Sequence, residues 1–172
     1  SGVTLPWTYS GMLFSTFCWH YEDIMLYSMN YLIKEALKYG TLSLNLTKEF
    51  EHVAHEKLGE TSKRDKNFLL DINTMISPTY LEKNGVSLNN QRLKFTERLR
   101  AGEFVITLPG AYHAGFSLGY NIAEANNLAC ESWLEYAETA YEGAENQERK
   151  SQFIQSNGSL LKIFENLNSF NF

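Results

Sequence analysis

Two histidines and one glutamate are the residues best suited to chemistry in this 172-residue chain. His20 and Glu22 lie two residues apart in a segment rich in aromatic and β-branched residues, so in a strand both side chains point to the same side. Two such positions are about 6–7 Å apart at the backbone, which lets both side chains reach one metal ion. A third ligand has to come from a neighbouring strand, and His113 is the strand-borne candidate.

Two histidines and one carboxylate form the facial triad that binds iron(II) in non-haem oxygenases. Such a triad leaves coordination positions open for a bidentate oxoacid and for dioxygen, whereas zinc accepts the same ligands but prefers four-coordinate geometry. The H-x-E spacing alone leaves open that His20 is a hydrogen-bonded core residue and that His113 belongs to a turn. We interpret the remaining histidines, His52 and His55, as exposed residues of a surface helix.

Strands are predicted to carry the candidate ligands. From Leu26 to Ile33, large apolar side chains alternate with smaller ones, so Ser28 and Asn30 share one face. Further strands are predicted over residues 103–108, 112–116 and 120–125, and helices over 47–58, 66–76, 80–83, 131–148 and 151–167.

This order of elements indicates an α+β, mainly β fold, in which an antiparallel sheet is interrupted by a helical insertion over about residues 47–84. Aromatic residues make up 14% of the chain, which favours a β-rich core. We expect the core to span residues 1–134 and a C-terminal helical segment to span 135–172. Strand-like sequence begins at once, so we expect the chain to be an excerpt of a larger protein.

Composition narrows the classes of function. The chain carries 15 Lys and Arg against 20 Asp and Glu, and a net charge of −5 argues against a nucleic-acid-binding surface. Cys18 and Cys130 form no CxxC pair, which argues against a zinc module or a disulfide framework and favours a reducing, intracellular compartment. No apolar run reaches the roughly 18 residues of a membrane span, so we expect no membrane partner.

Longer stretches around the candidate ligands resemble the jumonji C (JmjC) domain, and more narrowly the JARID-type histone lysine demethylases. The resemblance covers residues 1–134 and is weakest between 33 and 100. It implies a double-stranded β-helix, which is the cupin or jelly-roll barrel. The matching stretches are residues 5–12, 14–23, 27–32, 101–109, 111–116 and 119–127.

The resemblance also implies roles for individual residues. His20, Glu22 and His113 would bind Fe(II), and Lys38 would pair with the far carboxylate of the co-substrate 2-oxoglutarate. The other positions that would line the 2-oxoglutarate pocket are Phe17, Ser28, Asn30 and Asn121. The implied activity is the removal of methyl groups from lysine 4 in the tail of histone H3, in the nucleus and together with other subunits of a chromatin complex.

Residues 33–40 depart from the family pattern. The segment lacks the family's glycine–proline turn and pocket tryptophan and is two residues shorter, so a one-residue change in register would turn Lys38 to the other face. This departure keeps a second function open, in which a catalytically degenerate JmjC domain serves as a scaffold or histone-binding module in a chromatin-modifying complex. A third possibility is a JmjC hydroxylase that acts on another protein.

Overall fold

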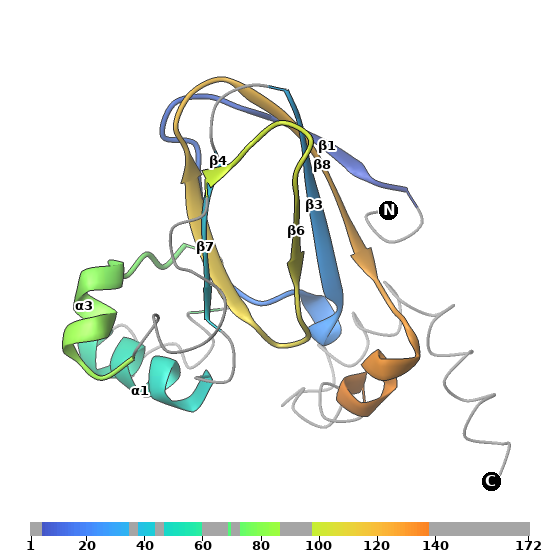
Figure 1. The fold of residues 1–172 in the computed structure, drawn as a ribbon. Helices are drawn as coiled ribbons and strands as arrows, with labels where there is room; N and C mark the ends of the chain where they lie inside the picture. The colour runs from blue at the N-terminus through green and yellow to red at the C-terminus, as the bar shows by residue number, and fades with distance from the viewer. Residues whose placement is uncertain are drawn as a thin grey trace, which may run out of the picture.

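Two antiparallel sheets face each other and form the body of the molecule (Figure 1). The computed structural model describes residues 5–34, 38–43, 47–59, 69, 73–86 and 98–137, and it gives the backbone alone for 38–43 and 98. One sheet has the strand order β1-β8-β3-β6 and the other has the order β2-β7-β4-β5. The strands are β1 (Trp7–Gly11), β2 (Thr16–His20), β3 (Tyr27–Lys34), β4 (Lys38–Ser43), β5 (Arg98–Leu99), β6 (Phe104–Thr107), β7 (Tyr112–Ser117) and β8 (Asn121–Leu128).

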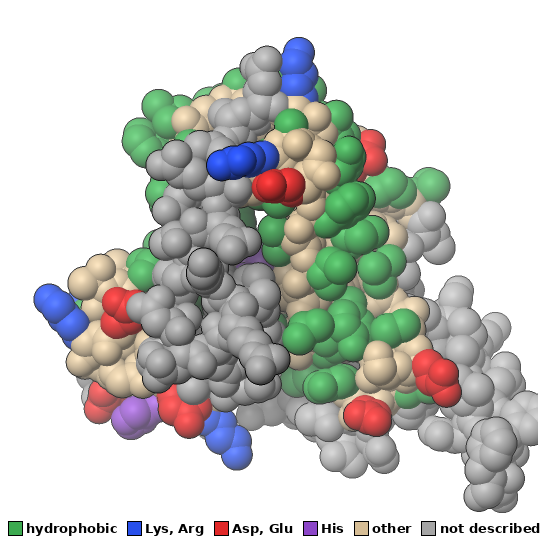
Figure 2. Space-filling view, viewed as in Figure 1, with side chains coloured by type: hydrophobic (Ala, Val, Ile, Leu, Met, Phe, Trp, Pro, Cys, Tyr) green, Lys and Arg blue, Asp and Glu red, His purple; other side chains and the backbone are tan. Residues whose placement is uncertain are grey.

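The inner face of the β1-β8-β3-β6 sheet is partly polar and partly apolar. Ser28 in β3 lies opposite Thr107 of β6 and Asn127 of β8, and both Ser28 and Thr107 are buried. On the outer face, exposed apolar side chains gather over β3 and β6 (Figure 2), among them Phe104 and Ile106. The predicted alternation in β3 therefore holds, and Ser28 is buried on the inward-facing side together with Leu32.

The β2-β7-β4-β5 sheet is covered on its outer face by the helical insertion (Figure 1). The insertion contains α1 (Thr47–Leu58) and α3 (Pro78–Lys83), and the bounds predicted for α1 are confirmed. Their apolar side chains pack against β2 and β7 in what we call the insertion cluster. Its buried members are Trp19, Phe50, Val53, Ala54, Leu69, Ile76, Leu81, Val86, Tyr112 and Ala114.

The helix predicted over residues 66–76 is wrong where the structure describes it. Residues 73–76 are not helical, because two of their carbonyl groups bind Trp19 of β2. The Trp19 backbone N–H donates to Thr74 O at 2.9 Å, and its indole N–H donates to Ile76 O at the same distance. The next helix is α3, which Ser77 caps by accepting the backbone N–H of Tyr80.

A short turn follows Glu22, and the chain beyond β8 packs against it (Figure 1). The turn is the 3₁₀ element η1 (Asp23–Met25), and the later segment contains η2 (Glu131–Trp133). The buried residues Leu26, Trp133 and Ala137, with Ile24, Tyr27 and Leu134 around them, form what we call the brace cluster. Residues 134–137 are helical, and the remainder of the helices predicted after 131 lies outside the described residues, so the boundary at 134 stays a prediction.

Two residues of η1 have left-handed backbone conformations. Ile24 has a φ of 50° and Met25 has a φ of 53°, a region that costs an L-residue other than glycine about 1–2 kcal/mol. The cost is highest for β-branched residues such as isoleucine. Within the described part of the chain, none of the helices combines the length and apolar character that spanning a bilayer requires.

Candidate metal centre

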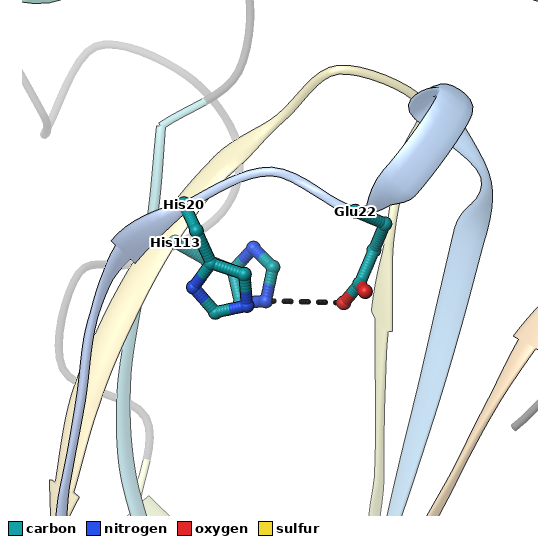
Figure 3. A group of neighbouring side chains, drawn as sticks. All are labelled: His20, Glu22 and His113. Carbon is teal, nitrogen blue, oxygen red and sulfur yellow. Dashed lines mark ion pairs between the residues drawn. The ribbon is translucent and has the colours of Figure 1, made fainter. Parts of the chain in front are cut away.

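His20, Glu22 and His113 come together inside the barrel (Figure 3). His20 ends β2 and lies directly opposite His113 in β7, and the two ring centroids are 4.2 Å apart. Glu22 reaches the same point from the chain just beyond β2. One potential ligand atom from each residue lies within 4.8 Å of the others, so one cation can contact all three.

Both histidines have one ring nitrogen fixed by the backbone. Nδ1 of His20 donates to Cys18 O at 2.7 Å, and Nδ1 of His113 donates to Ala111 O at 3.2 Å. A carbonyl oxygen can only accept, so each Nδ1 carries the hydrogen. In a neutral ring this leaves the lone pair on Nε2, which is the arrangement that a metal-binding histidine needs.

Both carboxylate oxygens of Glu22 have polar neighbours. Oε1 lies 3.4 Å from Nε2 of His113, and Oε2 accepts a hydrogen bond from Asn127 Nδ2 at 3.1 Å. Burial by itself raises the pKa of Glu22, but the hydrogen bond and charge of His113 and a hydrogen bond from Ser28 outweigh it and lower the pKa to about 2. Glu22 is therefore an anion at neutral pH.

The surroundings keep His20 suited to metal binding. Burial, reinforced by the neighbouring His113, lowers the pKa of His20, so its ring is neutral at pH 7. The ring of Phe17 lies 6.4 Å from that of His20 and 6.2 Å from that of His113, which places a large apolar group beside both histidines.

The pocket residues suggested by the resemblance lie on the inner faces of the barrel. Ser28 and Asn121 are buried, and Oδ1 of Asn30 is buried without a hydrogen-bond partner among the described residues. Gly11 makes room for Asn121, since a Cβ at Gly11 would lie 2.7 Å from Asn121 Nδ2 and 2.8 Å from Ser117 Oγ. The unsatisfied oxygen of Asn30 indicates that the interior is built to contain a polar group or water.

Lys38 can be placed through its backbone. It pairs with Ser117 of β7, which lies four residues after His113 and therefore shares its face of the strand. The pairing of β4 with β7 is regular from Lys38 to Ser43. The side chain of Lys38 lies outside the described residues, so its contact with 2-oxoglutarate stays a prediction.

Sequence reasoning missed three residues near the centre. Asn127 binds Glu22, Trp133 binds the turn after Glu22, and burial together with the charge of Glu22 raises the pKa of Tyr9. An available signal was the position of Asn127 in a strand whose alternate residues face inward. Trp133 lies outside any motif that the sequence analysis recognised.

The donor set fits a divalent metal ion of the first transition series. Two imidazole nitrogens and one carboxylate suit iron(II), and the three side chains point toward one another (Figure 3). Metal ligands in proteins are commonly oriented by further hydrogen bonds, and here such bonds are made by both histidine rings and by the carboxylate. The roles of the individual residues as metal ligands stay predictions.

Comparison with known proteins gives a consistent result. The family model described as "JmjC domain, hydroxylase" matches residues 7–128. Lysine-specific demethylase JMJ17 of Arabidopsis thaliana is 42% identical over 137 residues, which cover 79% of this chain and 11% of the relative. Lysine-specific demethylase JMJ703 of Oryza sativa subsp. japonica is 40% identical over 152 residues, which cover 87% and 12%. A human protein named "Probable lysine-specific demethylase 4F" is 40% identical over 140 residues, which cover 81% and 21%. The chain thus spans about a tenth to a fifth of the length of these curated relatives.

Proposed function

Because the chain belongs to the JmjC domain family, we propose that it is the Fe(II)- and 2-oxoglutarate-dependent catalytic domain of a histone lysine demethylase. Its two facing sheets have the jelly-roll fold that the sequence analysis predicted. The names of the relatives support demethylation of lysine as the reaction. The narrower resemblance to the JARID type favours lysine 4 of histone H3 as the substrate. Nuclear localisation and association with other chromatin-complex subunits belong to the same proposal.

The observation that carries this proposal is the convergence of His20, Glu22 and His113 with both histidine tautomers fixed by backbone carbonyls. A buried carboxylate is costly in a protein interior unless a cation is close to it. Iron(II) held by these residues would activate dioxygen, which is the oxidant. One oxygen atom would hydroxylate a methyl group on a lysine ammonium, while the other would oxidise 2-oxoglutarate to succinate and carbon dioxide. The resulting hemiaminal releases formaldehyde and leaves the lysine with one methyl group fewer.

The chain's own residues orient the carboxylate of Glu22, offer a polar group to the co-substrate and limit the access of water. Asn127 holds Oε2 of Glu22, which orients the carboxylate toward the histidines. Phe17 limits the access of water, and Asn30 offers an amide to a polar co-substrate inside the barrel. The net charge of −5 suits a basic histone tail as the substrate.

A titration without oxygen tests the proposal. Adding 2-oxoglutarate to the Fe(II)-loaded chain is expected to produce a metal-to-ligand charge-transfer absorption band. H113A should abolish the band, and H52A should retain it, because His52 is exposed on α1 away from the centre. In air, the same protein should release formaldehyde from methylated histone H3 peptides. No band at millimolar 2-oxoglutarate would refute the enzymatic function.

The departure of residues 33–40 from the family pattern favours a second candidate, a scaffold or histone-binding module without catalysis. The two candidates differ in the same titration. A scaffold would give no charge-transfer band but would retain binding of histone peptides, measured by calorimetry. A band without formaldehyde from any methylated histone peptide would instead support a hydroxylase that acts on another protein.

A further inference from the structure

We propose that Trp133 is a positioning residue for Glu22, which it orients by holding the strained turn that follows this carboxylate. The inference rests on the proposed function, because Glu22 is taken there as a metal ligand. It differs from that function in concerning a residue outside the ligand set and outside the barrel strands.

The turn after Glu22 has a conformation that its own residues disfavour. Asp23 O accepts the backbone N–H of Leu26 at 3.1 Å, and the two residues between them both have positive φ. This is the pattern of a type I′ turn, which strongly favours Asn-Gly at the two central positions. Here those positions are Ile24 and Met25, so local preference would move the turn toward another conformation.

Contacts from the chain beyond β8 hold the turn instead. The indole Nε1–H of Trp133 donates to Ile24 O at 3.1 Å, and the Trp133 side chain is buried beside Ile24 and Leu26 in the brace cluster. The hydroxyl groups of Tyr27 and Ser132 form a further hydrogen bond, at 2.9 Å. Packing and two hydrogen bonds therefore join the turn to the segment that follows β8.

The attachment matters because the backbone at Glu22 is held differently from the backbone at the two histidines. The two histidines sit in paired strands, whereas Glu22 lies after the end of β2, with its carbonyl accepting the backbone N–H of Met25 within the turn. A relaxation of Ile24 to a right-handed conformation would redirect the chain two residues from Glu22. The carboxylate would then point away from the two imidazoles.

Metal affinity measured on a matched pair of variants tests the proposal. Mn(II) serves as the probe and is titrated into the full 172-residue chain, with free Mn(II) followed by electron paramagnetic resonance. W133F retains an aromatic ring but loses the N–H donor. W19F removes the same type of bond, from an indole to a backbone carbonyl, on the outer face of the other sheet. We expect W133F to weaken Mn(II) binding about 10-fold or more and W19F to weaken it less than about 3-fold, in keeping with outer contacts of metal centres.

A second pair of variants separates positioning from general loss of structure. The double substitution I24N/M25G gives the turn its preferred residues, so it should hold its conformation without help. In that background, adding W133F should weaken Mn(II) binding less than about 3-fold. If W133F weakened Mn(II) binding as much in this background as in the natural turn, the proposal would be overturned. It would also be overturned if W133F and W19F weakened Mn(II) binding equally and in proportion to their loss of stability, measured as urea midpoints. If the unsubstituted chain bound no Mn(II), the proposed function would fail; normal binding by W133F would refute only the positioning role.

Discussion

The insertion cluster and the brace cluster lie on different sides of the metal centre, and each contains a tryptophan whose indole N–H donates to a backbone carbonyl. In the insertion cluster, Trp19 and Tyr112 enclose Phe50, with ring centroids 5.0 and 4.6 Å from the Phe50 ring. That cluster covers β2 and β7, the strands that carry both histidines. The brace cluster has three buried members and supports a turn in place of a strand pair.

The difference indicates that the ligands are held by two kinds of support. The histidines are fixed by strand register and by a large packed core behind them, so their positions depend on the same contacts as the fold. Glu22 depends on a few individual hydrogen bonds and on a backbone conformation that is costly by itself. Damage to the insertion cluster should therefore lower stability, and damage near the brace cluster should lower metal affinity.

The largest effect on stability is expected for F50A. Phe50 is fully buried, and its truncation leaves a cavity between Trp19 and Tyr112, so the free energy of unfolding should fall by about 3–5 kcal/mol. Urea denaturation followed by fluorescence measures the loss. I106A is the matched control, because Ile106 is 54% exposed and its truncation should change stability by less than about 0.5 kcal/mol. A loss below 1 kcal/mol for F50A would contradict the role given to the cluster.

E22Q should disable the metal centre without unfolding the chain. The amide of the introduced glutamine is a poor metal ligand, so Mn(II) affinity should fall at least about 100-fold, or about 2.7 kcal/mol. This loss is larger than the one expected when only a hydrogen bond to a ligand is removed. The far-ultraviolet circular dichroism spectrum should be unchanged. E56Q is the control on exposed α1 surface and should bind as the unsubstituted chain does. Retained affinity in E22Q would remove Glu22 from the ligand set.

N127A tests the carboxylate contact that does not pass through the turn. Loss of the amide donor leaves Oε2 of Glu22 without this partner, and Mn(II) affinity should fall about 10-fold, or about 1.4 kcal/mol. N73A, at an exposed position within the insertion, should leave the affinity unchanged. If both variants bound equally well, the Asn127 contact would have no part in orienting Glu22.

The smallest effect is expected for Y27F. The substitution removes one hydroxyl that bonds to Ser132 at the exposed edge of the brace cluster. Unfolding free energy should fall by about 0.5–1 kcal/mol, and Mn(II) affinity should change less than about 3-fold. A double-mutant cycle with S132A measures the coupling between the two hydroxyls. A coupling near zero would mean that the attachment of the turn rests on Trp133 without help from this pair.

Much of the centre could be predicted because its information is local. The alternation in β3 puts Ser28 and Asn30 on one face, as predicted. The strand expected to carry both His20 and Glu22 ends at His20, so the two-residue spacing does not by itself explain how Glu22 reaches the centre. The bounds of α1 follow from a capping residue and an apolar stripe. For β3 and α1, residues within a few positions of one another decide the outcome.

Long-range contacts account for what the sequence analysis missed. The bonds from Asn127 to Glu22 and from Trp133 to Ile24 join residues more than 100 positions apart, and no pattern in either segment indicates the other. The helix predicted over 66–76 failed for the same reason in residues 73–76. The apolar residues Leu69 and Ile76 have helical spacing, but the carbonyl groups of Thr74 and Ile76 bind distant Trp19.

The direct pairing of His20 with His113 also bears on how such a domain can change during evolution. Residues between β4 and β5 leave the barrel and return to it, so lengthening them costs little, since loop-closure entropy grows slowly with length. Deleting one residue within β2 would turn His20 to the outer side and remove it from the centre at once. During evolution, residues can therefore be inserted in the connections outside the barrel. The two paired strands that carry the histidines can exchange side chains, but they cannot gain or lose a residue.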